Sequence, residues 1–310
     1  MKIRLGYACI SNVLNITSSC TVTLTHYKNL DITTQQNKID SIILTNLNNL
    51  EKIITYNIKN EIYFFRITAK LIPLVDLIPI DLTKYKDKFN KLGKLINKNN
   101  IRVSVHADEY CVLNSVNDTV VLNSIKILDN LKTIMDLFDV NYNIILHIGS
   151  KTNGIKESIK RFKNNFNLLD NSIKNKIILE NDDRNYNVYQ TLKLCEDLKL
   201  PMCLDIHHHY CNKCTKNIEY YIKRIYKTYP KETTPKMHYS SPKSKKEKRS
   251  HNNYIDSKEF IDFIDLLKKY NIDTDIMIEA KEKDLALIKL SMELKYYTNY
   301  KFINNSTFII

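Results

Sequence analysis

Eight short apolar runs, separated by amphipathic stretches, constrain the fold of this chain more than any other feature of its sequence. Each run is five to seven residues long, and most are rich in Ile, Val and Leu, which is typical of strands buried on both faces. The runs are Ile3–Ala8, Ile62–Thr68, Ile101–His106, Asn143–Ile148, Lys176–Glu180, Met202–Ile206, Pro235–Tyr239 and Asp275–Glu279.

Helical patterns follow the runs, with apolar residues recurring at intervals of three and four. They cover Thr34–Ile58, Asp81–Ile96, Leu122–Leu137, Lys156–Leu169, Val188–Leu198, Thr215–Tyr229, Ser257–Tyr270 and Lys283–Tyr296. Strands that alternate with helices predict parallel pairing through helical crossovers. The closed form of this α/β pattern is a single (β/α)8 TIM barrel, and an open doubly wound sheet is the alternative. We expect one barrel domain over residues 1–298 and a C-terminal extension over residues 299–310.

The composition indicates a chain with a hydrophobic core and a basic surface. Hydrophobic residues make up 43%, yet no apolar run approaches the roughly 18 residues that a membrane span needs, and the start lacks signal-peptide features. Seven cysteines favour reduced thiols in an intracellular protein, and the C-x-x-C of Cys211 and Cys214 lacks a second pair of zinc ligands. The net charge of +13 favours nucleic acid as a partner; a basic surface without a partner is the alternative.

Imidazole and carboxylate side chains end six consecutive runs. They are His106, His147, Glu180, Asp205, His238 and Glu279, separated by 25 to 41 residues. Because parallel barrel strands present their carboxyl ends at one mouth, we expect these six side chains to converge. Burying many polar groups together is unfavourable unless they bind something, and a His, Asp and Glu set without Cys suits divalent ions such as Zn²⁺ or Mn²⁺.

Two further histidines and a basic segment extend this pattern. His208 lies in the expected loop after the sixth run, and His251 closes the loop after the seventh. The latter loop, Ser240–Ser250, carries one acid and five basic residues, which are Lys243, Lys245, Lys246, Lys248 and Arg249. Beside a barrel mouth it is expected to contact phosphate or else to be a solvated loop. Several metal ions beside a basic loop point to phosphodiester hydrolysis.

At these residues the sequence resembles the UV damage endonuclease family, whose barrel is related to that of endonuclease IV. The similarity runs in order from about residue 3 to residue 290. It is carried by Arg4-Leu5-Gly6-Tyr7, Arg102-x-Ser104-x-His106, Leu146-His147-Ile148-Gly149, Leu179-Glu180-Asn181-Asp182-Asp183, Asp205-x-x-His208, Lys236-x-His238-x-Ser240 and Asp275-Ile276-Met277-x-Glu279-Ala280-Lys281.

The resemblance implies a metal-dependent DNA repair enzyme. It implies up to three divalent ions, usually manganese, with zinc or magnesium as alternatives. The implied reaction is incision of DNA immediately 5′ to a UV photoproduct, a cyclobutane pyrimidine dimer or a 6-4 photoproduct, leaving a 3′-hydroxyl and a 5′-phosphate. The implied partner is damaged double-stranded DNA, without a nucleotide cofactor, and the expected state is a monomer.

The resemblance also implies roles for individual residues. One ion would bind His106, His147 and Glu180; a second would share Glu180 and add Asp205, His238 and Glu279; a third would use His208 and His251. The implied catalytic residues are Glu180, Lys236 and Glu279. The family's carboxylated lysine corresponds to Lys236, where a carbamate would turn a cation into an oxygen ligand. An unmodified Lys236 that contacts phosphate is the alternative.

The family reads damage by inserting a polar and an aromatic side chain into the gap left by a flipped-out dinucleotide. Glu109 and Tyr110 occupy the matching positions, and Tyr7 and Asn12 are expected near the lesion. The chain departs from the family here, because His106 is followed by Ala-Asp-Glu-Tyr, where the family has Pro and then Gln-Tyr or Gln-Phe. Two acids beside DNA require compensation from metal, Lys or Arg, so the metal site is better supported than the lesion probe.

Three other functions remain open on the sequence. An endonuclease IV-like apurinic/apyrimidinic-site endonuclease would share the fold and the ligands. A sugar isomerase can share a metal-lined barrel mouth, although the basic loop argues against it. A damage-binding protein that does not cut is the alternative without catalysis, and the full ligand set argues against that one.

Overall fold

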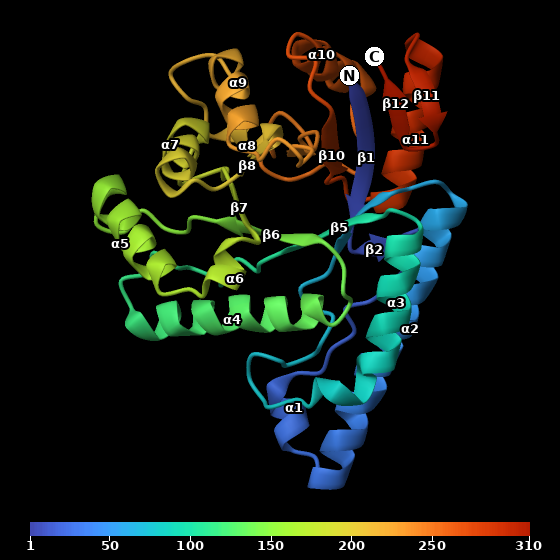
Figure 1. Ribbon diagram of the computed structural model, residues 1–310, viewed down its shortest axis with the longest axis vertical. Coiled ribbons are helices and arrows are strands. Elements are labelled where there is room, and N and C mark those ends of the chain that lie inside the picture. The colour runs from blue at the N-terminus through green and yellow to red at the C-terminus, as the bar shows by residue number, and fades with distance from the viewer.

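The computed structural model of the chain describes residues 1–310 and contains a closed barrel of eight parallel strands (Figure 1). The strands are β1 (Lys2–Ala8), β4 (Phe64–Ile67), β5 (Arg102–His106), β6 (Tyr142–His147), β7 (Ile177–Glu180), β8 (Met202–Asp205), β9 (Lys236–Tyr239) and β10 (Thr274–Ile278). They are adjacent in this order, and β10 pairs in parallel with β1 to close the ring. The predicted TIM barrel is therefore confirmed, and this closure excludes the open sheet.

Helices cover the outside of the barrel in the places where the sequence predicts them. The main ones are α2 (Ile32–Lys59), α3 (Lys86–Lys98), α4 (Asp118–Asp136), α5 (Ile155–Asn167), α7 (Val188–Leu198), α9 (Glu219–Lys227), α10 (Ser257–Lys268) and α11 (Lys283–Tyr297). Asp31 caps α2, and a capping box between Asn187 and Gln190 starts α7. None of the helices has the length and apolar character that crossing a membrane requires.

Shorter elements complete the chain. They are β2 (Ile10–Ser11), β3 (Ile16–Thr17), α1 (Leu24–Lys28), the 3-10 helix η1 (Leu82–Tyr85), α6 (Asn171–Lys174), α8 (Ile206–Cys211), β11 (Lys301–Asn304) and β12 (Thr307–Ile309). The expected helix that opens at Asp81 is divided between η1 and α3. Helix α8 is an addition to the prediction, and it bears on the metal centre described below.

Alternation along each strand separates the helix-facing core from the barrel interior. In β1, Leu5 and Tyr7 belong to the main cluster of 70 buried apolar residues, whereas Gly6 and Ala8 face inward. Glycine is required at position 6, because a Cβ there would lie 2.4 Å from the carbonyl oxygen of Phe64 and 2.6 Å from its ring. The close approach lets Phe64 fill the interior beneath the barrel mouth.

A charged network fills the interior at the amino-terminal ends of the strands. Asp275 accepts hydrogen bonds from Arg4 Nε at 2.9 Å and from Arg102 Nη1 at 2.5 Å. Arg102 also donates to the carbonyl oxygen of Thr234. Because these residues come from β1, β5 and β10, the network ties non-adjacent strands together across the floor of the barrel.

The last residues form a hairpin that extends the sheet beside β1. Strand β12 pairs antiparallel with residues 2–4 of β1, whereas β4 pairs in parallel with residues 7–8. At the tip of the hairpin, Ser306 Oγ donates to the carbonyl oxygen of Glu61, and the carbonyl of Ser306 accepts from the Leu5 amide. The buried ring of Phe308 stacks on Tyr300 at a centroid separation of 5.2 Å. The hairpin thus covers the part of β1 that β4 does not reach.

Truncating Phe308 tests how much this hairpin contributes to stability. We expect Phe308→Ala to lower the free energy of unfolding by about 3–5 kcal/mol, because it removes a fully buried ring. Urea denaturation of the metal-free protein measures the loss. Ile309→Ala is the matched control, since that side chain is 41% exposed, and should cost much less. Equal stability of the Phe308 variant and the parent would contradict this account.

Candidate metal centre

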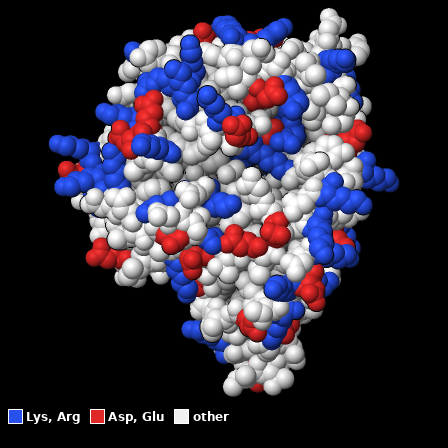
Figure 2. Space-filling model, in the orientation of Figure 1, with Lys and Arg blue, Asp and Glu red and all other residues white.

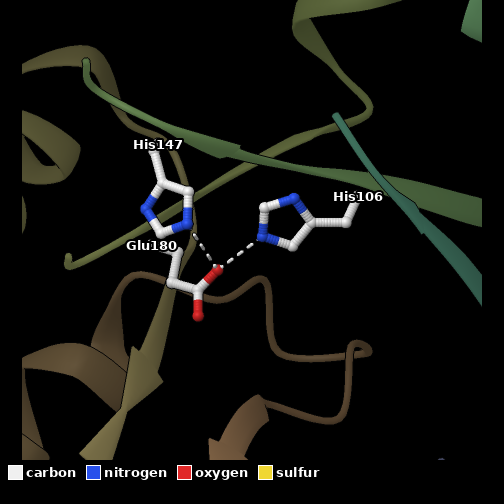
Figure 3. Close-up of side chains that lie close together, drawn as sticks. All are labelled: His106, His147 and Glu180. Atoms are coloured by element: carbon white, nitrogen blue, oxygen red, sulfur yellow. Dashed lines mark hydrogen bonds and ion pairs between the residues drawn. The ribbon is translucent and has the colours of Figure 1, made fainter. Parts of the chain in front are cut away.

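The six strand-end side chains converge at the carboxyl ends of the strands, with Glu180 at their centre. Its Oε2 lies 2.8 Å from His106 Nε2 and 3.6 Å from His147 Nε2 (Figure 3). Its Oε1 lies 2.8 Å from Nδ1 of His238, which is 3.1 Å from Glu279 Oε1. One buried carboxylate therefore joins imidazoles from β5, β6 and β9.

Two groups of three ligand atoms are close enough to hold a metal ion. One is His106, His147 and Glu180, and the other is Glu180, Asp205 and His238, with the ligand atoms of each group within 4.8 Å of one another. Glu180 belongs to both groups, so two ions bound there would share it. Glu279 joins the second group through its contact with His238.

Several polar atoms of this centre are buried without a hydrogen-bonding partner. They are Nδ1 of His147, Oδ2 of Asp205, Nε2 of His238 and Nζ of Lys236. Unpaired buried polar atoms are costly, and native structures rarely contain many together. A divalent ion would satisfy the imidazole and carboxylate atoms of this set, so the residues present fit a metal.

Burial and mutual charge shift the acid–base properties of these groups in opposite directions. Burial raises the pKa of Asp205 to about 6 and lowers the pKa of His147 to about 4. Burial opposes the charged form of Glu180 too, but His238 and His147 hold its pKa well below the usual range. Burial would lower the pKa of His208, but Asp205 and Glu180 raise it to about 9. Without metal, His208 therefore carries positive charge beside Glu180 and Asp205, whereas His147 is neutral.

His208 lies on a helix, and its expected place in a loop is wrong. The carboxylate of Asp205 accepts a hydrogen bond from the His208 amide at 2.7 Å and so caps α8. The helix brings Nδ1 of His208 to 3.7 Å from both Glu180 Oε1 and Asp205 Oδ2. Sequence analysis missed this helix because its apolar pattern is too short to stand out.

His251 lies after β9 as expected, and its Nδ1 bonds to the carbonyl oxygen of Glu279 at 2.6 Å. Neither His208 nor His251 belongs to the two ligand groups, so their joint metal site stays a prediction. His207, which sequence analysis did not single out, lies between them: its ring is 5.0 Å from that of His251, and its Nε2 bonds to the carbonyl oxygen of Arg249.

Lys236 is fully buried in the barrel interior, one inward-facing position below His238. Its Nζ lies 5.3 Å from the centroid of the Phe64 ring and has no hydrogen-bonding partner. Burial, aided by the nearby Arg102, lowers the pKa of this amine well below the usual range of lysine. Burial therefore favours the neutral form of this amine, beneath the candidate metal ligands.

The expected lesion-contacting residues lie in different environments. Glu109 and Tyr110 follow β5 on the surface, and the Tyr110 ring is 72% exposed. Asp108 beside them pairs with Lys70 at 3.3 Å, so one of the two acids is compensated. Asn12 is partly exposed, and its amide donates to Glu282.

The expectation for Tyr7 does not agree with its position. Its ring is fully buried and faces the helix layer, where its hydroxyl donates to Asn57 Oδ1 at 2.7 Å and its ring contacts Phe65 edge-on. The cause is strand alternation: Gly6 and Ala8 face the barrel interior, so Tyr7 must face outward. In this conformation Tyr7 has no surface at which it could contact a lesion.

The basic loop, Ser240–Ser250, folds back on itself beside the centre. The Lys243 amide donates to the carbonyl oxygen of Ser250, and Pro242 forms a bridge with His251. Lys243 pairs with Glu247, and Arg249 lies 3.5 Å from Asp183. The remaining basic side chains of the loop, Lys245, Lys246 and Lys248, are exposed and have no acidic partner. Figure 2 shows Lys and Arg spread over much of one face of the molecule with acids between them. The loop therefore differs from other basic segments in its contacts with His207 and His251 rather than in its charge alone.

Comparisons with known proteins agree with this geometry. Residues 3–308 match the family described as UV-endonuclease UvdE. A UV DNA damage endonuclease of Bacillus mycoides (strain KBAB4) is 34% identical over 315 residues, with 99% of each chain covered. The crystal structure of SacUVDE matches with a TM-score of 0.85 and 28% identity, covering 95% of this chain and 98% of that one. Endonuclease IV from Thermus thermophilus matches with a TM-score of 0.58 at 15% identity, covering 94% of this chain and 99% of that one, which shows a shared fold alone.

Proton competition makes metal binding at this centre depend on pH. A metal ligand must be unprotonated, whereas the pKa values of His208 at about 9 and Asp205 at about 6 leave protons on these groups in neutral and mildly acidic solution, respectively. Each proton that metal displaces makes the affinity rise about tenfold per pH unit. We therefore expect metal-free protein to bind Mn²⁺ at least about tenfold more tightly at pH 8 than at pH 6. The free-ion signal in electron paramagnetic resonance measures the affinity.

His208→Gln is the matched variant for this titration, because it removes the imidazole with the raised pKa. Its Mn²⁺ affinity should depend less on pH between 7 and 9 than that of the parent. Equal affinities of the parent protein at pH 6 and pH 8 would contradict the predicted proton competition.

Proposed function

The chain belongs to the UV-endonuclease UvdE family, and from this premise we propose that it is a metal-dependent DNA repair endonuclease that incises the backbone immediately 5′ to UV photoproducts. The products are a 3′-hydroxyl and a 5′-phosphate, and the substrates include cyclobutane pyrimidine dimers and 6-4 photoproducts. The single observation that carries the proposal is the convergence of two imidazole–carboxylate groups on Glu180 at the barrel mouth. DNA as substrate implies that the protein acts inside the cell, and it acts as a monomer without a nucleotide cofactor.

The residues that would hold divalent ions are those of the two groups, together with Glu279. His106, His147 and Glu180 would hold one ion, and Asp205, His238 and Glu279 would complete a second site around Glu180; His208 and His251 are the candidates for a third. Manganese suits this mixture of oxygen and imidazole ligands, and zinc or magnesium are the alternatives. When bound, such ions supply Lewis acidity that lowers the pKa of water and offsets negative charge on phosphate oxygens.

Lys236 contributes to the centre as a neutral amine. A buried amine that has lost its proton is nucleophilic and can add carbon dioxide; the new N–C bond forms, an N–H proton leaves to solvent, and a carbamate results. The unpartnered Nζ beneath the ligands supports this modification. An unmodified Lys236 would instead present a cation or an N–H donor toward phosphate.

The surface around the mouth supports DNA as the substrate. The basic loop, which is bridged to His251 at Pro242, carries three exposed lysines without an acidic partner that can contact phosphates. Tyr110 is exposed four residues after His106, and an exposed aromatic ring can stack on a base for about 1–3 kcal/mol. Glu109 beside it is the polar half of the probe, and Lys70 compensates the neighbouring Asp108. Asn12 donates through its side-chain amide to Glu282, three residues after Glu279.

The abasic-site endonuclease is the second candidate, because the likeness to endonuclease IV extends over 94% of this chain. A likeness at 15% identity indicates a shared fold but does not indicate a shared substrate. The relatives at 32–34% identity, by contrast, are UV DNA damage endonucleases. Sugar epimerases share the fold at similarly low identity. The family match therefore favours UV photoproducts over the other substrates.

Incision of defined duplexes tests the proposal. Metal-free protein is supplied with Mn²⁺ and given four otherwise identical duplexes that contain a thymine dimer, a 6-4 photoproduct, an abasic site or no damage. We expect a cut directly 5′ to either photoproduct and none in the undamaged strand. Preferential cutting of the abasic duplex would support the second candidate, and tight binding without a cut would support a damage-binding protein.

Removing a proposed metal ligand should greatly slow the reaction. We expect His147→Ala and Glu180→Gln to reduce the incision rate by at least about 100-fold, because even outer partners of metal ligands typically cost 10–100-fold. His26→Ala is the matched control, since His26 lies on α1 and belongs to neither ligand group. Unchanged cutting by both site variants would rule out the metal centre.

Neutralising the basic loop should weaken DNA binding without removing the metal ligands. We expect replacement of all five basic residues, Lys243, Lys245, Lys246, Lys248 and Arg249, by Gln to flatten the dependence of affinity on salt. Fluorescence anisotropy of a labelled duplex at several salt concentrations measures the slope. Five exposed lysines replaced on α3 and α5 form the control with equal charge. If the loop variant keeps the parent's slope, the loop does not contact phosphate.

A further inference from the structure

We propose that Arg66 is a positioning residue of the metal centre: its guanidinium holds one oxygen of Glu279, so that this carboxylate presents its other oxygen to a divalent ion. The inference rests on the proposed metal-dependent function and extends it to a residue outside the two ligand groups. Sequence analysis missed Arg66 because no ligand chemistry draws attention to an arginine within an apolar run. The position of Arg66 on the inward-facing side of its strand could have indicated a role in the barrel interior.

The strand register explains how the two residues meet. Arg66 lies on β4 and Glu279 directly follows β10, and β1 separates these strands in the barrel. Ala8 pairs with Arg66, and the preceding Tyr7 pairs with Ile278, so Ala8 lies level with both partners. Because β1 contributes only a methyl group there, the guanidinium can reach across the strand. Its Nη1 donates to Glu279 Oε1 at 2.5 Å.

The contact divides the Glu279 carboxylate into an occupied and a free oxygen. Oε1 is engaged by Arg66 and lies 3.1 Å from His238 Nδ1, whereas no protein group donates to Oε2. Arg66 is also the only Lys or Arg that pairs with any of the three carboxylates of the mouth, which are Glu180, Asp205 and Glu279. Arg66 therefore fixes the rotamer of Glu279, whereas the other two carboxylates have no Lys or Arg partner and would be held by the ions.

A purely stabilising ion pair explains the arrangement less well. The two side chains are only 13% and 12% exposed, and Nε of Arg66 is buried without a partner. Guanidinium and carboxylate groups lose much hydration when buried, so a buried pair with an unused donor adds little to stability. Partners that orient metal ligands, by contrast, commonly determine metal affinity.

Metal binding by stripped protein tests the inference without reference to catalysis. Mn²⁺ is titrated into the parent, Arg66→Gln, Glu279→Gln and the double variant, with the free ion followed by electron paramagnetic resonance. We expect Arg66→Gln to weaken one class of Mn²⁺ site by about 10–100-fold. The double variant should bind no more weakly than Glu279→Gln, because Arg66 acts through Glu279. Arg224→Gln is the matched control, since Arg224 pairs with Glu196 on the outer surface.

Thermal melting of the metal-free variants identifies any that do not fold. If Arg66→Gln fails to fold, Arg66→Lys replaces it, and this variant should bind one class of Mn²⁺ several-fold more weakly than the parent. The role of Arg66, but not the proposed function, would be overturned if the folded Arg66 variant bound Mn²⁺ as tightly as the parent. Additive losses of affinity in the double variant would overturn it as well. A parent protein that binds no Mn²⁺ would instead overturn the proposed function.

Discussion

The buried carboxylate of Glu180 is the interaction on which the rest of the site depends. Its oxygens lie 2.8–3.6 Å from ring nitrogens of histidines on three other strands. The carboxylate also belongs to both groups of ligand atoms. Such a carboxylate is tolerated in a barrel interior only while opposite charge surrounds it, because an isolated buried ion is strongly unfavourable. Without metal, His238 and His208, whose pKa values are raised, supply that charge, and divalent ions would supply it with metal.

The barrel beneath this carboxylate is built to hold it in place. Phe64 packs against Gly6 in the interior, Lys236 lies over the Phe64 ring, and a network of Arg4, Asp275 and Arg102 closes the floor. Each successive inward-facing residue of a strand therefore belongs to a different layer of the interior, with the potential ligands uppermost. The same packing that makes the interior rigid also keeps the ligands pointing toward one another.

Much of the fold followed from periodicity, and the exceptions have identifiable causes. All eight strands and eight main helices lie where the apolar patterns predict them, because such patterns reflect burial directly. Helix α8 was missed because it spans only six residues, too few for an apolar repeat to appear. Tyr7 was expected near DNA because its motif matched the family, but strand alternation turns its ring toward the helices.

The sequence by itself determined the barrel, the family resemblance and the convergence of six ligand-type side chains. The convergence follows because parallel strands in a closed ring have all their carboxyl ends at one mouth of the barrel. Only the tertiary structure decided which side chains touch. That Arg66 reaches Glu279 across β1, that Lys236 is buried without a partner, and that His207 lies against His251 depend on register and on side-chain packing between distant segments. The spacing of residues along the chain does not determine register or side-chain packing, since these contacts join residues from separate strands and loops.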